Sequence, residues 1–319
     1  EKFTEFKKLE KISIGNKIKT GISTGDFEHI EKNLESSNVL ILTNEKMDSI
    51  IRHGAEWIEE IGLVISDEVH LIGDEGRGPT LEMILTHLKL LDTKPQIVGL
   101  SATITNSDEI AKWLDCKLVK NDWRPVPLSE GVCDGGQVTM SDGKTFEVKP
   151  SLRGIPIDLG VQCVQEGGQS LVFAATRVSS KSLATKASDI ISQFLQKKEL
   201  SALEKTSKQI LAENEHTEIV KTLATLIKKG VAFHHAGLNQ KCREIVEKEF
   251  RKGTIKLLSS TPTLAAGVNL PARRVVISNI NRYNAKIGAN RPISILEYKQ
   301  LCGRAGRPQY DDYGESIIV

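Results

Sequence analysis

Short apolar runs alternate with longer amphipathic stretches along the chain, and this alternation limits the fold more than any other feature of the sequence. An apolar run of about four residues fits a strand buried on both faces of a parallel sheet, and an amphipathic stretch fits a helix that covers the sheet. The sequence therefore predicts an α/β fold with parallel sheets. The candidate strands are 39–42, 63–66, 96–100, 170–173, 231–234, 255–258 and 274–277, and the candidate helices are 80–91, 179–197 and 238–251.

The length and composition are those of two globular domains. The chain has 319 residues, of which 39% are hydrophobic and 26% charged, and no apolar run approaches the roughly 20 residues that cross a bilayer. Pro125 and Pro127 interrupt regular structure between the two sets of strands, so we expect domains at 1–124 and 125–319. A net charge of +2 neither requires nor excludes nucleic acid, and five widely spaced cysteines predict neither disulfides nor a zinc site.

An acidic pair follows the candidate strand 63–66. Asp67 and Glu68 stand at the strand's carboxyl end, and His70 follows two residues later. Two adjacent carboxylates there are unfavourable unless a cation lies beside them. A Mg²⁺ held with nucleotide phosphates would supply that charge, with Asp67 on the metal side and Glu68 positioning the attacking water. A solvated acidic turn is the other interpretation.

Two further segments of the first half end strands with small polar residues. The hydroxyl groups of Ser101 and Thr103 suit hydrogen bonds to neighbouring carboxylates, or a cap on the helix expected near Asp108. Thr43 and the residues after it open a helix, where hydroxyl, amide and backbone N–H groups suit a phosphate. Ordinary capping explains the same residues, so neither segment is specific by itself.

The second half repeats this pattern at three strand ends. Thr176 and Arg177 place a hydroxyl and a cation after 170–173, and hydroxyl groups crowd the start of 259–271. His234 and His235 are adjacent, but their side chains point to opposite faces of a strand and no other metal ligand stands at suitable spacing. We therefore expect one histidine in the core and one facing a cleft.

The segment 300–308 carries the most specific pattern in the chain. Arg304 and Arg307 are three residues apart, so they share a face if the helix continues through them. Two guanidinium groups flanked by glycines suit the oxyanions of a phosphoryl-transfer site. A solvated basic helix end is the alternative, although the glycines disfavour a helix.

The Gly143-Lys144-Thr145 sequence resembles the end of a phosphate-binding loop. That loop requires a glycine five residues earlier, where Val138 stands. Asp142 and Gly143 lie between two alternating apolar segments, so they predict a hairpin turn instead.

Five segments, in order, resemble the motifs of the superfamily 2 DExH helicases: 67–70, 101–103, 233–238, 259–271 and 300–308. The His-His-Ala-Gly-Leu and Gly-Val-Asn-Leu-Pro-Ala sequences look like the superkiller-like branch. The segments 70–79 and 296–299 look closest to the archaeal fork-repair DNA helicases, which are relatives of the polymerase theta helicase domain. The resemblance covers nearly the whole chain and implies two RecA-like domains with parallel sheets, the first truncated at its N-terminus.

The resemblance implies a role for each motif. Asp67 and Glu68 would handle Mg²⁺ and water, and His70, Ser101 and Thr103 would couple hydrolysis to motion. The ATP would be reached from the second domain by Gly267, Asn269, Gln300, Arg304 and Arg307. A hairpin within 276–295 would act as a strand-splitting wedge. The nucleic-acid strand would be contacted by Thr43, Asn44, Lys46, Thr176, Arg177, His235, Thr261, Thr263, Arg282 and Tyr283.

The function implied by the resemblance is an ATP-dependent 3′ to 5′ DNA helicase with ATP and Mg²⁺ as cofactors. It would unwind branched or forked DNA in repair and replication restart, as a monomer in the cytoplasm at the nucleoid. We expect the chain to begin after the family's Gly-rich phosphate loop and to end before its strand-gripping domains, so that this fragment alone is inactive. An RNA helicase of the same branch and a non-catalytic pseudo-motor fragment are the alternatives.

Overall fold

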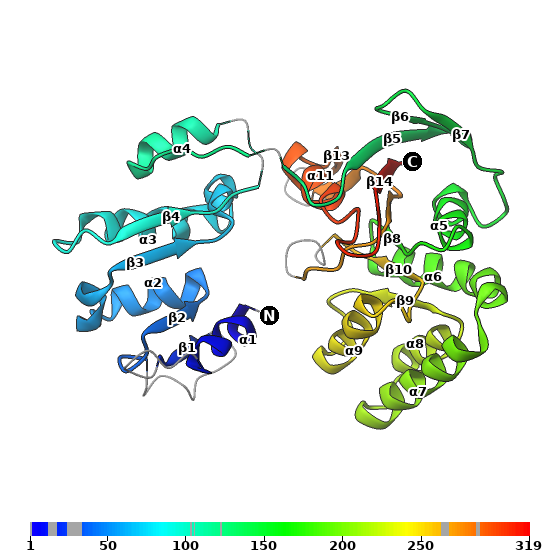
Figure 1. The fold of residues 1–319 in the computed structure, drawn as a ribbon, viewed down its shortest axis with the longest axis horizontal. Helices are drawn as coiled ribbons and strands as arrows, with labels where there is room; N and C mark the ends of the chain where they lie inside the picture. The colour runs from blue at the N-terminus through cyan, green and yellow to red at the C-terminus, as the bar shows by residue number, and fades with distance from the viewer. Residues whose placement is uncertain are drawn as a thin grey trace. The chain divides into compact units, whose positions relative to one another are not determined.

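The computed structural model describes residues 2–11, 18–23, 34–102, 104, 106–121, 123–262, 268–284 and 288–319. The chain forms two compact units, unit 1 (Glu1–Lys120) and unit 2 (Asn121–Val319), shown in Figure 1. Strands alternate with helices in both, which confirms the predicted α/β fold. Among the described residues, no helix is long and apolar enough to cross a membrane.

The described residues of unit 1 form two separate pairs of parallel strands. The first pair, β1 and β2, begins at Thr20 opposite Val39, and the second pair, β3 and β4, begins at Leu63 opposite Gln96. The predicted strands 39–42, 63–66 and 96–100 are therefore present. The elements are α1 (Lys2–Phe6), η1 (Lys7–Lys11), β1 (Thr20–Ser23), β2 (Val39–Leu42), α2 (Asn44–Arg52), η3 (Glu56–Glu60), β3 (Leu63–Ser66), η4 (Val69–Gly73), α3 (Gly78–Leu90), β4 (Gln96–Gly99) and α4 (Ser107–Leu114).

One hydrophobic cluster of unit 1 forms where α2 and α3 pack together. Ile50 of α2 meets Ile84 and Leu88 of α3, and Leu40 and Val64 of the strands pack against them. Helix α3 begins two residues before the predicted 80–91 because Pro79, in its first turn, needs no backbone N–H partner there.

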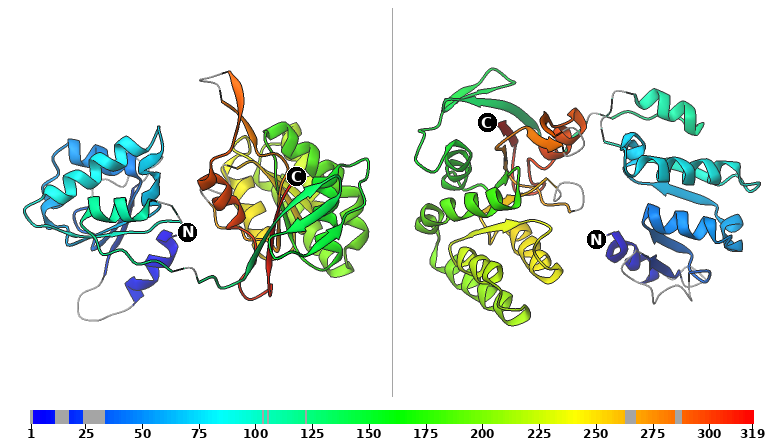
Figure 2. Two further views of the ribbon diagram at one scale, coloured as in Figure 1. Left: turned by 90° about the horizontal axis from the view of Figure 1, so that it is seen from above. Right: turned by 180° about the vertical axis from the view of Figure 1, so that it is seen from behind.

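Unit 2 is built on one eight-stranded sheet in the order β7-β6-β5-β14-β11-β8-β10-β9. Neighbouring strands from β5 to β9 in this order run parallel, and the hairpin of β6 and β7 extends the sheet in antiparallel fashion, as Figures 1 and 2 show. The strands are β5 (Leu128–Asp134), β6 (Gln137–Met140), β7 (Thr145–Glu147), β8 (Ser170–Phe173), β9 (Val231–His234), β10 (Leu257–Ser260), β11 (Arg274–Ile277) and β14 (Gly314–Ile318).

Four neighbouring strands at the β9 end of this sheet are buried along their whole length. Every residue of β8, β9, β10 and β11 is buried, as expected for parallel strands covered on both faces. The prediction of a strand at 255–258 is wrong by two residues, because β10 continues through Ser259 and Ser260. The Ser260 hydroxyl donates to the carbonyl oxygen of His234 at 3.0 Å, which makes its burial possible.

The helices of unit 2 pack on this sheet: α5 on β8 and β11, α6 on β9 and β10, and α8 on β9. The predicted helix 179–197 is wrong at its end, since α6 stops at Ile191 and a 3-10 turn follows. Helices α7 and α8, which pack on each other, were not predicted. The helices are α5 (Ile155–Gln165), α6 (Arg177–Ile191), η5 (Ser192–Phe194), α7 (Lys197–Glu213), α8 (Glu218–Lys228), α9 (Gln240–Arg251) and α11 (Ile295–Cys302).

Two hairpins of unit 2 had been anticipated. Asp142 and Gly143 form the turn between β6 and β7, where Gly143 has a φ of 84°. The prediction of a hairpin turn at this segment, in place of a phosphate-binding loop, is confirmed. The second hairpin pairs β12 (Asn281–Asn284) with β13 (Ala289–Pro292) inside the predicted range 276–295. It projects from the rest of unit 2 in the left view of Figure 2.

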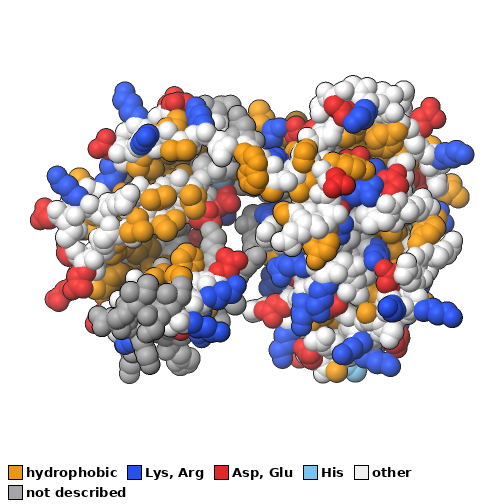
Figure 3. All heavy atoms as spheres, in the orientation of Figure 1, with side chains coloured by type: hydrophobic (Ala, Val, Ile, Leu, Met, Phe, Trp, Pro, Cys, Tyr) orange, Lys and Arg blue, Asp and Glu red, His pale blue; other side chains and the backbone are white. Residues whose placement is uncertain are grey.

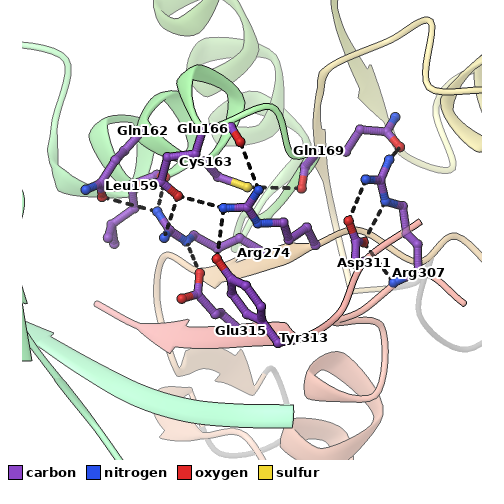
Figure 4. A network of polar contacts seen from close by, with 11 residues as sticks. Leu159, Gln162, Cys163, Glu166, Gln169, Arg274, Arg307, Asp311, Tyr313 and Glu315 are labelled. Carbon is purple, nitrogen blue, oxygen red and sulfur yellow. Dashed lines mark hydrogen bonds and ion pairs between the residues drawn. The ribbon is translucent and has the colours of Figure 1, made fainter. Parts of the chain in front are cut away.

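Buried arginine contacts join the elements at the amino end of β11. Arg274 is 2% exposed, and its Nε donates to Glu315 of β14 at 2.7 Å. Its Nη1 donates to the carbonyl oxygen of Leu159 in α5 at 3.0 Å and to Gln162 at 3.2 Å. Figure 4 shows this network, which ties two strands and one helix together.

Candidate functional site

The acidic pair of unit 1 lies where β3 ends. The carbonyl oxygen of Ser66 accepts from the Leu100 N–H, and the Val69 N–H donates to the Leu100 carbonyl oxygen, both at 2.9 Å. Between these bonds, Asp67 and Glu68 are exposed. Glu68 has a φ of 54° and a ψ of 41°, a left-handed conformation that is unfavourable for a residue with a side chain. The backbone therefore stores strain at the predicted catalytic carboxylate.

His70 connects this pair to the end of β4. Its ring is buried, and Nε2 lies 3.0 Å from a carboxylate oxygen of Glu68. On the other side, Nδ1 accepts from the Ala102 N–H at 3.2 Å and lies 3.2 Å from the Ser101 hydroxyl. Because a backbone N–H can only donate, Nδ1 is the acceptor, and Nε2 carries the proton that is donated to Glu68.

Burial lowers the pKa of His70 below its ordinary value of 6.5, against the opposing charges of Glu68 and Asp67. A neutral ring agrees with the hydrogen bonds, since a proton on Nδ1 would face the Ala102 N–H. Helix α4 begins with Asn106 as its N-cap residue, so the alternative that Ser101 caps this helix is wrong. Thr103 lies outside the described residues.

The carboxylates suit a magnesium ion only with help from other ligands. Asp67 offers exposed oxygen ligands at a strand end, which are the ligands that Mg²⁺ prefers. Within the described ranges, no group of three or more His, Cys, Asp or Glu side chains could hold a metal ion. The residues therefore fit an ion whose remaining ligands are phosphate oxygens and water, the usual arrangement in nucleotide sites.

Thr43 and its neighbours begin helix α2, as the sequence suggested. Thr43 is the N-cap residue, its hydroxyl accepts from the Lys46 N–H at 3.3 Å, and Asn44 is the first helical residue. Capping explains the hydroxyl of Thr43, while the remaining N–H groups of the first turn keep the polarity that suits an anion.

A hollow of about 400 Å³ lies in unit 2 beside the carboxyl ends of β8 and β10. Four of the predicted nucleic-acid residues line it, although they come from distant parts of the sequence. Thr176 is also the N-cap residue of α6, where its hydroxyl accepts from the Ser179 N–H at 3.0 Å. The lining residues are Ala175, Thr176, Arg177, Ala236, Thr261, Pro262, Arg282 and Glu297.

Arg282 belongs to β12, so the hairpin of β12 and β13 contributes one side chain to the lining of this hollow. Its Nη1 donates to the carbonyl oxygens of Asn279 at 2.9 Å and Asn281 at 3.2 Å. Its Nε lies 3.5 Å from a carboxylate oxygen of Glu297 in α11. Lys and Arg side chains also gather in Figure 3 on the part of unit 2 where α9 lies. The hollow thus combines one acidic side chain with two arginines, two threonines and three small apolar residues.

Both histidines at the end of β9 are buried, so the expectation that one faces a cleft is wrong. His234 is 5% exposed and lies 3.0 Å from Glu247, whereas His235 is 3% exposed and stacks on Phe233 at 5.4 Å between ring centroids. The Gly237 N–H donates to Nδ1 of His235 at 3.0 Å. Burial and the charges of Arg177 and His234 lower the pKa of His235.

Arg304 and Arg307 do not share a helix face, which corrects the geometry expected from their spacing. Helix α11 ends at Cys302, and Gly306 has a φ of 88° that no helix allows. Nη1 of Arg304 donates to Oδ1 of Asn269 at 3.0 Å.

Arg307 instead forms a two-point ion pair with Asp311. Nε donates to Oδ2 at 2.7 Å and Nη2 to Oδ1 at 2.6 Å. Nη1 donates to Gln169, which directly precedes β8, as Figure 4 shows. Arg307 therefore lies at the amino end of β8, opposite the end where Thr176 lines the hollow.

The remaining predicted site residues lie partly outside the described part of the chain. Thr263 and Gly267 lie outside the described residues, as does the side chain of Tyr283, although its backbone belongs to β12. Gln300 lies in α11.

Two residues of these sites escaped the sequence analysis. Glu297 follows Arg282 by fifteen residues, and no local pattern signals a pair at that separation. Asp311 follows Arg307 by four residues, a spacing of opposite charges that could have identified the pair.

Comparison with known proteins gives matches in both units. Residues 1–110 match the DEAD/DEAH box helicase family, and residues 155–309 match the helicase conserved C-terminal domain. The chain is 44% identical over its whole length to the ATP-dependent DNA helicase Hel308 of Methanocella arvoryzae, and 44% to that of Pyrococcus horikoshii. It is 43% identical over 95% of its length to that of Pyrobaculum calidifontis. The chain spans 42% of the length of each of these relatives.

Proposed function

We propose that this chain, which belongs to the superfamily 2 helicases with RecA-like domains, supplies the motor domains of an ATP-dependent DNA helicase. The observation that carries the proposal is the contact of His70 with both Glu68 and Ser101. It joins a strained carboxylate at the end of one strand to the end of the next. Such a contact suits a site where hydrolysis is coupled to a conformational change in another part of the protein.

In this proposal the carboxylates of unit 1 carry out ATP hydrolysis. Mg²⁺, when bound, neutralises phosphate charge as it develops in the transition state. Asp67 holds the ion through an exposed carboxylate. Glu68 orients the attacking water and accepts its proton, and the neutral ring of His70 holds Glu68 by donating to it.

Arg304 and Arg307 are the candidates for the nucleotide phosphates in unit 2, together with Asn269, Gln300 and Gly267. Arg304 already bonds Asn269, which orients it without neutralising its charge. Contact between Arg307 and a phosphate requires its bonds to Asp311 to open or to be shared. The domain division at 1–124 and 125–319 belongs to the same proposal.

The hollow of unit 2 holds the backbone of a nucleic-acid strand in this proposal. Arg177 supplies a cation, Thr261 a hydroxyl, and the first turn of α6 its N–H groups, all of which suit phosphate oxygens. Arg282 links this hollow to the hairpin of β12 and β13, which we propose as the strand-splitting wedge, with Tyr283 stacking on a base. The proposed strand contacts also include Thr43, Asn44, Lys46 and Thr263.

We assign DNA as the substrate because the similar proteins are named ATP-dependent DNA helicases. Single-stranded and forked DNA are the forms that we propose. The proposal includes 3′ to 5′ movement, unwinding of branched DNA during repair, action as a monomer and location at the nucleoid. Ser101 and Thr103 would transmit hydrolysis to this movement.

The decisive experiment measures ATP turnover by the full-length protein with matched single-stranded DNA and RNA. Stimulation by DNA supports the proposal, and unwinding of labelled forks then tests the substrate structure. Stimulation only by RNA makes the protein an RNA helicase, and no turnover with either contradicts the motor function. The Glu68→Gln variant should bind ATP without turnover, whereas normal turnover would exclude Glu68 as the catalytic residue.

A further inference from the structure

The segment that follows unit 1 packs against the loop that carries Arg304. Nη2 of Arg124 donates to the carbonyl oxygen of Ala305 at 3.2 Å and to that of Gly303 at 3.5 Å. Val126 is 4% exposed and lies so close to Gly306 that a Cβ there would approach its Cγ1 to 2.6 Å. The loop 303–306 is therefore in contact with residues 124–126 through both polar and apolar groups.

The same loop is held from the other side by the residues that precede β11. The Ala272 N–H donates to the carbonyl oxygen of Arg304 at 2.9 Å, and the Gly306 N–H donates to the carbonyl oxygen of Ala272 at 2.7 Å. The carbonyl oxygens of three successive residues are thus all occupied, the outer two by Arg124 and the middle one by Ala272. This arrangement fixes the backbone from which the Arg304 side chain reaches Asn269.

We propose that Arg124 is a positioning residue for Arg304 and acts on ATP turnover only through the loop 303–306. Arg124 stands four residues after Lys120, the last residue of unit 1, and its guanidinium group holds the loop 303–306 by hydrogen bonds to two carbonyl oxygens. One Nη2 group directs its two N–H bonds in a fixed plane, as two carbonyl oxygens separated by one residue require. A lysine keeps the charge without this geometry. The inference rests on the proposed ATPase function.

The first test is steady-state ATP hydrolysis by the full-length protein with saturating single-stranded DNA. Displacement of a transition-state group by about 1 Å lowers a rate by up to about a hundredfold. Arg124→Ala should therefore lower kcat by about ten- to a hundredfold and leave KM for ATP nearly unchanged, because Arg304 acts on the transition state. Arg124→Lys should recover only part of the loss. Lys149→Ala, which removes an exposed cation elsewhere in unit 2, should match the wild type.

A double variant separates positioning from a general structural effect. If Arg124 acts only through Arg304, Arg124→Ala should not lower the residual rate of Arg304→Ala any further. A further loss in the double variant, a change in KM alone, or a kcat equal to that of Lys149→Ala overturns the inference.

Hydrogen exchange in the nucleotide-free protein tests the hold on the loop without any activity. Arg124→Ala should speed exchange at the amide of Gly306, which donates to Ala272, while the central strand β8 keeps its protection. Unchanged exchange at 304–306 overturns the inference even if the protein proves to have no ATPase. Turnover absent from the wild type, with faster exchange in the variant, contradicts the proposed function and leaves the positioning contact supported.

Discussion

Replacing Asp311 with alanine would leave the guanidinium group of Arg307 without its carboxylate. The two side chains are 3% and 14% exposed, respectively. Asp311 accepts three hydrogen bonds from Arg307, from Nε at 2.7 Å, from Nη2 at 2.6 Å and from the backbone N–H at 2.9 Å. The substitution therefore leaves Arg307 with its hydrogen bond to Gln169 and its stacking contact with Tyr310.

The expected loss follows from this burial. Removing one partner of a buried ion pair lowers the free energy of unfolding by about 3–5 kcal/mol. Arg307 keeps its bond to Gln169 and reaches solvent in part, so we expect about 3 kcal/mol, the lower end of that range. For a unit of this size, about 2–4 °C of midpoint is lost per kcal/mol, which predicts a shift of about 6–12 °C.

The assay is calorimetric unfolding of the chain, with Asp312→Ala as the matched control. Asp312 is exposed and adjacent, so its removal should change the free energy of unfolding by no more than about 0.5 kcal/mol. Replacing Arg307 and Asp311 together removes the uncompensated charge. The loss of unfolding free energy in the double variant should therefore be smaller, by about 1–3 kcal/mol, than the sum of the losses in the two single variants. Equal midpoints for the Asp311 and Asp312 variants, or additive losses in the double variant, would refute the reasoning.

Three other predictions follow from the two units. Because burial lowers the pKa of His70, the unfolded chain takes up a proton that the folded unit 1 does not, so urea unfolding should show its stability decreasing as pH falls below 6.5. The His70→Gln variant should lose that part of the pH dependence. A Cβ on Gly78 would overlap the carbonyl oxygen of Ile72, so Gly78→Ala should lower the unfolding free energy by about 1–3 kcal/mol. Gly76→Ala, where only the flexible Asp74 side chain lies near, should be tolerated in the same unfolding assay. Arg177→Ala should weaken single-stranded DNA binding by the full-length protein and reduce the log-log salt slope by about 1, and an unchanged slope would exclude a phosphate contact.

Much of the local structure was predictable because its causes are local. Apolar runs such as 231–234 and 274–277 form strands wherever a sheet buries them, and polar residues directly after them must lie at the sheet's carboxyl edge. The acidic pair at Asp67 was recognisable for this reason. The boundaries were less predictable: α6 ends at Ile191 although the sequence stays compatible with a helix beyond it.

Contacts between distant residues were decided by the tertiary structure alone. Residues 70 and 101 come into contact because β3 and β4 are neighbours in a parallel pair. The order of the strands in a sheet is not predicted by the residues of either segment. The separation of Arg304 from Arg307 depends on the bend at Gly306, which Val126 and Gly314 shape from outside the segment.

By itself, the sequence determined the α/β class, the strand-end motifs and the turn at Gly143, since each depends on residues close together in the chain. Only the tertiary structure decided that Arg124 holds the Arg304 loop across 181 positions and that Arg307 meets Gln169 across 138. The physical reason is that strand order and chain reversals bring these groups together. The packing free energies that select those arrangements come from the whole core and not from the few residues that come into contact.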